Sequence, residues 1–318
     1  AQLMAGSFEH ALDYLIDTEI DLSEIAKRYR NDETGAPAYD LAVMLTIVLL
    51  AYSRGVVSSR AIERLCRENV LFRAISGDSA PQFTTIAKFV RELGEEASAV
   101  FTQVLLICDR QGLIGRQMFA IDGVKLPSNA DKRRSGTHAE LAHEAERMEA
   151  AAAKMLKAHR ARDESKDAGE AEFPDSERIE RLRNEARRTR AFLAANAERR
   201  SEKGALRNGN VTDNDSAKMA TSKGVIQGYT AVAAVDGKTQ VIVAEQAHGS
   251  GCEQSVLLPM VEKTNLMRTD QTIVTADAGY HSEANLKALH DAEVPALVAD
   301  GLMRRRDERF AAQARYVT

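Results

Sequence analysis

The chain contains no tryptophan and only six prolines and three cysteines in 318 residues. Cys66, Cys108 and Cys252 are odd in number, lie far apart and form no C-x-x-C pair. This spacing argues against a disulfide scaffold and against a zinc knot. We expect three reduced, buried thiols, as in a cytoplasmic protein.

The sequence also lacks a long apolar run and a secretion signal. Its longest apolar stretch, residues 41–52, is about a dozen residues, whereas a bilayer-spanning helix needs roughly 20. No basic segment followed by an apolar stretch and a small-residue cleavage site opens the chain. We therefore expect a cytoplasmic protein with no membrane partner.

The chain has little excess of either charge, because its 43 Lys and Arg residues nearly balance its 47 Asp and Glu residues and leave a net charge of -4. This balance excludes a wholly basic, histone-like binder, but it leaves room for a local DNA-binding face, since the clustering of charges sets the local field. The length predicts two domains.

Residues 1–116 read as short capped helices separated by glycine turns, which is typical of a helix-turn-helix array. A buried stripe is predicted on the helix over 41–52, at Leu41, Met44, Leu45, Val48, Leu49 and Tyr52. A further helix begins near residue 83, on which we expect Thr84, Thr85, Lys88 and Arg91 to face outward, toward a DNA groove. The alternative is an all-α packing domain whose charged faces are only solvated.

The pattern changes at Gln117. Residues 118–121 form a short apolar strand that ends at Asp122. Residues from about 130 to 210 are rich in Ala, Glu and Arg and contain heptad-like apolar spacing, which predicts an inserted helical hairpin. Its arginines, between Arg178 and Arg190, are either a solvated face or a phosphate-binding one.

The remaining chain has the period of strands and short helices. Strands are predicted over 228–235 and 239–244 around an Asp236-Gly237 turn, then over 272–276 and 294–298, with helices over 253–266 and 282–291. The predicted fold class is therefore α/β: an all-α N-terminal domain over 1–116, then a mixed sheet over 117–318 in the order β, helical insertion, ββαβαβ.

Two aspartates, Asp122 and Asp277, each follow a short apolar strand. If these two strands are parallel neighbours, both carboxylates lie at the same sheet edge, where open sheets bind ligands. Paired hard oxygens favour Mg²⁺ over zinc, because no His/Cys cluster accompanies them. The alternative is that each Asp is only a turn former or a helix cap. Glu245 and Glu253 lie at element edges and are weaker candidates.

Four local motifs carry a resemblance to a known family. They are residues 52–64 (YSRGVVSSRAIER), 81–89 (PQFTTIAKF), 120–126 (AIDGVKL) and 275–281 (TADAGYH). In this order they resemble the bacterial insertion-sequence DDE transposases, whose catalytic core is RNase H-like and belongs to the retroviral integrase superfamily.

The resemblance implies a transposase that cuts and joins element ends with Mg²⁺, for which Mn²⁺ can substitute. Asp122 and Asp277 would be its catalytic metal ligands. Its partners would be double-stranded DNA, at terminal repeats and target, and a second copy of the chain, in a bacterial cytoplasm at the nucleoid. The expected DNA contacts are Arg60, Arg64, Thr84, Thr85, Lys88, Arg91, Lys125, Arg187 and Arg188.

The family's third acid is a Glu on a helix after the fifth strand, and no residue here matches it. Asp300 and Glu308 are weak candidates. We expect the sequence to be the N-terminal part of a longer protein with this Glu beyond Thr318, and the chain itself to be inactive in cleavage. Two alternatives remain: an RNase H-like nuclease without strand transfer, and an inactive DNA-binding or oligomerising fragment.

Overall fold

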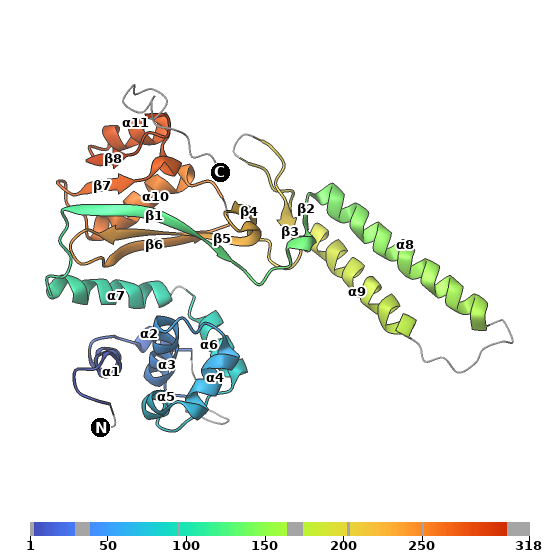
Figure 1. Ribbon diagram of the computed structural model, residues 1–318, viewed down its shortest axis with the longest axis horizontal. Helices are drawn as coiled ribbons and strands as arrows, with labels where there is room; N and C mark the ends of the chain where they lie inside the picture. Colours follow the sequence, from blue (N-terminus) through green and yellow to red (C-terminus); the bar gives the residue numbers. More distant parts are fainter. Residues whose placement is uncertain are drawn as a thin grey trace. The chain divides into compact units, whose positions relative to one another are not determined.

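The computed structural model describes residues 3–28, 39–94, 96–163, 174–201, 204–249 and 251–303 (Figure 1). The chain divides into two compact units, Ala1–Ile114 and Gly115–Thr318. The first unit is helical, and the second contains a mixed sheet with helices. The α/β class predicted from the sequence is confirmed.

The N-terminal unit is built from short helices with local caps. They are α1 (Phe8–Thr18), α2 (Ser23–Ala26), α3 (Leu41–Ser53), α4 (Ser59–Glu68), α5 (Val70–Ile75), α6 (Phe83–Glu92) and α7 (Glu96–Arg110). Asp40 caps α3 by accepting hydrogen bonds from the amides of Ala42 and Val43, and Asn69 caps α5 in the same way through Leu71 and Phe72.

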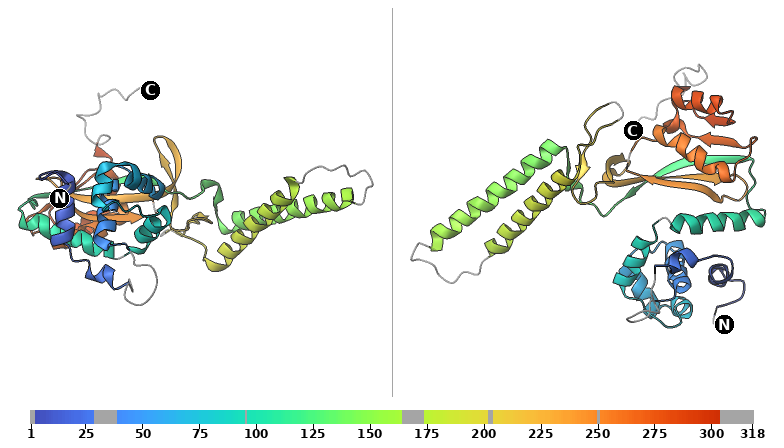
Figure 2. Two further views of the ribbon diagram at one scale, coloured as in Figure 1. Left: turned by 90° about the horizontal axis from the view of Figure 1, so that it is seen from below. Right: turned by 180° about the vertical axis from the view of Figure 1, so that it is seen from behind.

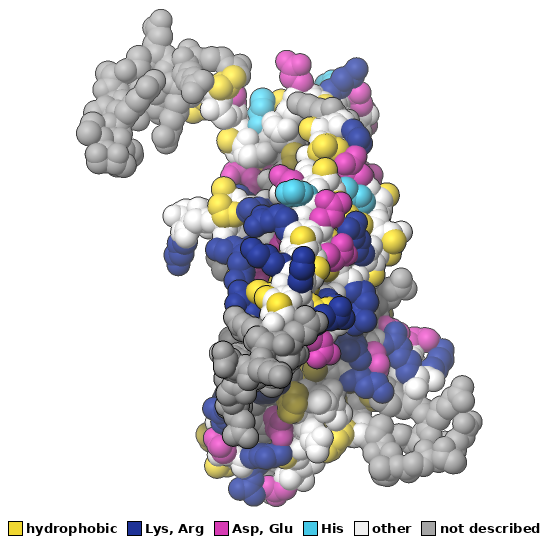
Figure 3. Space-filling view, turned by 90° about the vertical axis from the view of Figure 1, so that its right-hand side faces the viewer, with side chains coloured by type: hydrophobic (Ala, Val, Ile, Leu, Met, Phe, Trp, Pro, Cys, Tyr) yellow, Lys and Arg dark blue, Asp and Glu magenta, His cyan; other side chains and the backbone are white. Residues whose placement is uncertain are grey.

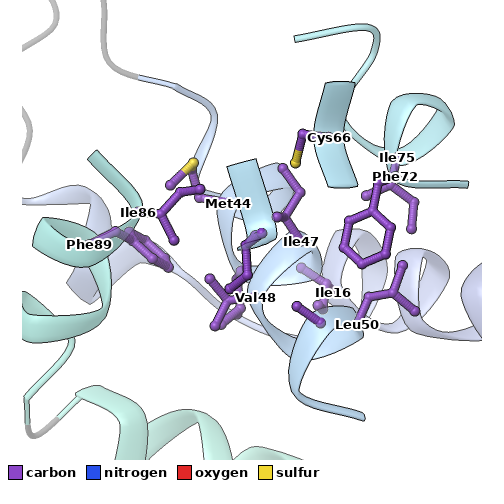
Figure 4. Packing of buried hydrophobic residues seen from close by; sticks show 13 residues of the cluster. Ile16, Met44, Ile47, Val48, Leu50, Cys66, Phe72, Ile75, Ile86 and Phe89 are labelled. Atoms are coloured by element: carbon purple, nitrogen blue, oxygen red, sulfur yellow. The ribbon is translucent and has the colours of Figure 1, made fainter. Parts of the chain in front are cut away.

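Helix α3 forms the centre of this unit, as Figure 4 shows. Ile47, Leu50 and Ala51 are fully buried, and Phe72 and Ile86 from α5 and α6 complete the cluster. The stripe expected from the sequence was partly wrong: Tyr52 is 40% exposed, while Ile47 and Leu50, outside that stripe, lie deepest. A helix surrounded by neighbours is buried nearly all round, so its sequence lacks a one-sided pattern.

Helix α6 receives its cap from a neighbouring helix. Its N-cap residue, Gln82, makes no side-chain capping bond. Instead, the Phe83 amide donates to Glu63 Oε2 of α4 at 3.0 Å. The guanidinium of Arg60, also on α4, lies 4.7 Å from the centre of the Phe83 ring. The start of α6 is therefore fixed by α4.

The second unit contains a six-stranded mixed sheet. Its strands are β1 (Met118–Pro127), β4 (Ala217–Thr221), β5 (Gly224–Asp236), β6 (Ile242–His248), β7 (Ile273–Ala276) and β8 (Ala296–Val298). Strand β1 pairs antiparallel with β5 and parallel with β7, which in turn pairs parallel with β8. Strands β4 and β6 both pair antiparallel with β5. The expected parallel pairing of the two Asp-bearing strands is confirmed.

The helices of this unit include α10 (Leu257–Lys263), which packs on β5 and β6, and α11 (Glu283–Asp291), which contacts α10 (Figure 2). Short 3₁₀ turns η2 (Gln254–Val256), η3 (Thr264–Leu266) and η4 (Ala278–Tyr280) flank them. The helix expected over 253–266 is thus a helix of seven residues between two 3₁₀ turns.

Three details of the sequence interpretation were wrong. Strand β4 was not predicted, so three sheet strands rather than two lie between the helical hairpin and α10. Strand β1 does not end at Asp122 but continues to Pro127, because β5 supplies hydrogen-bonding partners along that whole length. Of the three thiols expected to be buried, only Cys66 is; Cys108 is half-buried and Cys252 is exposed. All three are free.

Between β1 and β4 the chain forms two long helices, α8 (His138–Asp163) and α9 (Pro174–Ala195), which lie side by side in Figure 1. Leu141, Ala145 and Ala152 of α8 are buried against Ile179 and Ala186 of α9. Two short strands, β2 (Ser135–Gly136) and β3 (Gly209–Asn210), pair at the base of this hairpin.

A buried polar network joins that base to the sheet. Asn210 is fully buried, and its amide group donates to Asp131 O and Ser135 Oγ. Ser135 Oγ donates to Gln227 of β5, and Gln227 donates to Ser216. Because these side chains satisfy one another, the network fixes the entry and exit of the hairpin.

Asp236 fixes the opposite end of β1. This carboxylate is 1% exposed and accepts four backbone hydrogen bonds, from Gly115, Arg116, Lys238 and Thr239. Burial by itself raises the pKa of a carboxylate, but these amides hold the pKa of Asp236 below its ordinary value of 3.8. Asp236 thus ties the segment before β1 to the β5–β6 turn.

We expect Asp236→Asn to destabilise the protein by about 2 kcal/mol at pH 7, because the new amide group faces backbone donors. The folded pKa is lowered, so the carboxylate's contribution is complete above the unfolded pKa and is lost as the pH falls through the folded one. Urea denaturation at pH 7 and below pH 3.8 measures both effects. An equal loss at both pH values would contradict the ionic role.

Replacing residues 138–207 with a short Gly/Ser turn should leave the sheet folded. Gly136 pairs with Gly209, so the cut ends lie next to each other, and the Asn210 network remains. A cooperative thermal transition by circular dichroism is the expected result. Loss of that transition would show that the hairpin stabilises the sheet.

Candidate active site

Asp122 and Asp277 are brought together by the parallel pairing of β1 and β7. The last pair in register is Ile121 with Ala276, and the two aspartates are the next residues on their strands. Both are exposed. The sequence signal, an Asp after each apolar strand, therefore located two carboxylates at one sheet edge.

Each aspartate uses one oxygen locally. Asp122 Oδ1 accepts from the Gly123 amide at 2.7 Å, and Asp277 Oδ1 accepts from the Gly279 amide at 2.8 Å. Asp277 is thus also the N-cap of η4, which is the simpler role that its sequence position allowed. Within the described residues, neither carboxylate forms an ion pair, so the second oxygen of each is open to a ligand.

A third carboxylate, Glu253, lies beside Asp277. A Cβ atom built on Gly279 would be 2.2 Å from Glu253 Oε2 and 3.1 Å from Asp277 Oδ1. Because both distances are measured from the same point, Glu253 Oε2 and Asp277 Oδ1 are separated by no more than the sum of the two. Sequence reasoning ranked Glu253 low because it lies at the edge of a helix, and nothing in its local pattern places it near Asp277.

Asn285 of α11 holds the segments of Glu253 and Tyr280 together. Its amide group donates to the main-chain carbonyls of Gln254, at 2.8 Å, and Tyr280, at 2.9 Å. Asn285 is buried. Ser282 caps α11, because its side-chain hydroxyl accepts a hydrogen bond from the main-chain N–H of Asn285. This arrangement fixes the residue after Glu253 to the residue after Gly279.

Tyr280 is a buried polar residue on which these acids act electrostatically. Its side chain is 0% exposed, and its hydroxyl has no hydrogen-bond partner among the described residues. The hydroxyl lies 3.0 Å from the point where Gly123 would carry a Cβ. Burial, and then the negative charges of Glu253, Asp122 and Asp277, raise the pKa of Tyr280.

An open groove of about 640 Å³ adjoins the acids. Gly123 and Glu253 lie at its lining together with two cations, Lys125 and Lys223. Lys125 Nζ donates to Ala220 O at 3.2 Å, which holds this ammonium group at the groove. Lysines beside carboxylates suit a polyanionic chain that passes the acidic site.

The DNA contacts expected in the N-terminal unit fall on α4 and α6. Arg60 and Arg64 are exposed on α4, and Thr84, Lys88 and Arg91 are exposed on α6. Thr85 is half-buried and lies outside this exposed row. The three exposed residues of α6 have the spacing i, i+4, i+7, which places them on one face of the helix.

Arg187 and Arg188 are exposed on α9, and Arg187 donates to Asn184 at 2.7 Å. Figure 3 views the chain from the side of the hairpin and shows basic and acidic side chains mixed over this surface. Arg190, for example, pairs with Glu149 of α8 at 3.0 Å. The hairpin therefore presents a mixed surface, with part of its positive charge already paired.

Of the two weak candidates for a third acid, only Asp300 lies within the described residues, two positions beyond the last β7–β8 pair, Ala276 with Val298. Asp300 follows β8 and accepts from the Leu302 amide at 2.8 Å, while Glu308 lies outside the described residues. Glu245 is exposed on β6. Across the described residues, no group of three His, Cys, Asp or Glu side chains is arranged to hold a metal ion.

Among the residues that the structure describes, no helix has the length and apolar character needed to span a bilayer. Comparison with curated proteins gives no match. Comparison with solved structures also gives no match. Residues 1–92 match a family model described as a transposase domain (DUF772). The match spans α1–α6, ends with the last residue of α6, and supports a transposase.

Proposed function

We propose that this chain is a DDE transposase with an RNase H-like core, which cuts and joins the ends of an insertion element through Asp122 and Asp277. The observation that carries the proposal is their position, one residue beyond the last parallel pair of β1 and β7. The transposase-domain match to residues 1–92 supports it from the other unit.

The two aspartates fit a divalent cation of the Mg²⁺ type. Both are exposed, both belong to adjacent strands, and each keeps one oxygen without a partner in the described structure. Mg²⁺ binds through one or two carboxylates and keeps several waters, so two such oxygens are a sufficient protein contribution. Mn²⁺ has the same ligand preferences.

An ion held by Asp122 and Asp277 would supply Lewis-acid chemistry: it would lower the pKa of an attacking water or 3′-hydroxyl and offset the charge on the leaving oxygen. The remaining tasks belong to the chain. Asp122 and Asp277 hold their carboxylates at fixed positions through Gly123 and Gly279. Lys125 and Lys223 line the adjacent groove, where they would hold the phosphates of a strand.

The N-terminal unit would bind the duplex. Lys88 and Arg91 stand on one exposed face of α6, and Arg60 and Arg64 stand on α4, which packs against α6. Such a pair of helices can place cations on the phosphates and polar groups such as Thr84 on base edges. Arg187 and Arg188, which are exposed on α9, would add phosphate contacts.

Asp122→Asn and Asp277→Asn, in the full-length protein, should each abolish Mg²⁺-dependent cleavage and joining. Binding to labelled element ends should remain within about twofold, because duplex affinity comes from cationic side chains. Gel assays of cleavage and of binding measure the two effects, with Asp291→Asn on α11 as the control. Retained cleavage in either variant would overturn the site.

The double variant Lys88→Ala, Arg91→Ala should weaken DNA binding. It should also lower the salt dependence of the logarithm of the affinity by about two units of slope, because two phosphates are no longer neutralised by the protein. The matched control is Lys27→Ala, Arg73→Ala, since these two cations already pair with Glu24 and Asp78. Equal slopes for the two double variants would remove α6 from the interface.

Two other functions make different predictions in the same assays. An RNase H-like nuclease would nick DNA but would not join a pre-cut end to a target. A DNA-binding or oligomerising protein without catalysis would bind ends and show no Mg²⁺-dependent nicking. Strand transfer with a pre-cut end oligonucleotide therefore separates the proposed transposase from both.

A further inference from the structure

Gly279 marks a place where two carboxylates from distant parts of the sequence approach each other. The space of its missing side chain is occupied by Glu253 Oε2, 2.2 Å from the Cβ position, with Asp277 Oδ1 at 3.1 Å. The backbone of Gly279 does not have a positive φ, so its conformation does not demand glycine. The space left by the missing side chain is instead used by the end of the Glu253 side chain.

We propose that Glu253 is a third carboxylate of the cation site begun by Asp122 and Asp277, and that Gly279, Tyr280 and Asn285 are the residues that position it. The proposal rests on the proposed function of that site. It adds to that site a carboxylate from the connection between β6 and α10, within the part of the chain that the structure describes.

A buried group without a partner points independently to a ligand at this place. The Tyr280 hydroxyl is fully enclosed and, among the described residues, unpartnered, and the charges of Glu253, Asp122 and Asp277 all act on it. An unsatisfied buried hydroxyl is unfavourable, so a structural role alone would favour phenylalanine. A hydroxyl among carboxylates is instead suited to donate to one of them or to a bound water.

Asn285 explains why Glu253 stays near Asp277. It bonds to the carbonyls of Gln254 and Tyr280, and Gln254 also donates to His281 O at 2.9 Å. The turn that begins α10 is therefore tied to the turn after β7 by three hydrogen bonds. Two negative side chains held together in this way repel each other unless a cation lies between or beside them.

The arrangement favours a role for Glu253 through water. The described residues contain no set of three acids placed for simultaneous direct ligation. Mg²⁺ commonly retains several waters in protein sites, and a carboxylate that accepts hydrogen bonds from such waters strengthens binding without touching the ion. Glu253 lies next to Asp277 and also lines the groove with Lys125 and Lys223, so it faces both cation and substrate.

Cation binding can be measured without activity. The chain has no tryptophan and seven tyrosines, so luminescence of Tb³⁺ excited through the protein reports an ion near a tyrosine. We expect the wild-type chain to sensitise Tb³⁺ and Mg²⁺ to compete for the site. Tyr280→Phe should lose most of this emission yet fold with equal or higher stability, whereas Tyr229→Phe, whose hydroxyl bonds to Asp213, should keep it.

Glu253→Gln should lower the affinity for Mn²⁺, measured by calorimetry, roughly tenfold or more. Glu262→Gln, an exposed acid on α10, is the matched control and should leave the affinity unchanged. Gly279→Ala should weaken binding in the same direction while every carboxylate is retained, because the new methyl group displaces the end of the Glu253 side chain and crowds Asp277 Oδ1.

The outcomes separate the two proposals. Unchanged Mn²⁺ affinity in Glu253→Gln, with a large loss in Asp122→Asn and Asp277→Asn, would overturn the role of Glu253 and leave the proposed function intact. Unchanged affinity in both aspartate variants would overturn the cation site itself. Weaker binding in Glu253→Gln and Gly279→Ala, with Glu262→Gln like wild type, is the result that supports the third carboxylate.

Discussion

The double pairing of β1 is the interaction on which the rest of the second unit depends. Along its full length β1 bonds to β5, and along its first four residues it bonds to β7 in parallel. The parallel pairing ends one residue before Asp122 and Asp277. From that point on, strand β1 keeps β5 as a partner but no longer pairs with β7, and the two carboxylates lie at this position. An exposed edge with fixed backbone and unpaired acids follows directly from this register.

Buried polar groups hold the ends of that strand. At the start of β1, Asp236 collects four amides and joins the preceding segment to the β5–β6 turn. Beyond its end, Asn210, Ser135 and Gln227 form a chain of bonds where the helical hairpin leaves the sheet. Asn285 does the same for the turns that carry Glu253 and Tyr280. Each network is enclosed and satisfied, which gives these connections one geometry.

Only one buried hydroxyl of this region lacks such a partner, among the residues that the structure describes: that of Tyr280. The negative charges of Glu253, Asp122 and Asp277 act on it, and the glycines at 123 and 279 leave room for neighbours. A buried polar group that the fold leaves unsatisfied, under the influence of three carboxylates and near a lysine-lined groove, is an observation that supports the proposed cation and phosphate site.

The apolar periodicity and the turn residues of the sequence by themselves determined the α/β class, the order of the sheet strands apart from β4, and the position of each aspartate after a strand, because these signals are local. Tertiary structure alone decided the length of β1, which the partner strand β5 sets, and the cap of α6, which comes from Glu63 on another helix. It also decided that Glu253 lies beside Asp277. No periodic pattern in the sequence relates residues 253 and 277. Asn285 of α11 brings their segments together through its bonds to Gln254 and Tyr280, and such a contact exists only after the chain has folded.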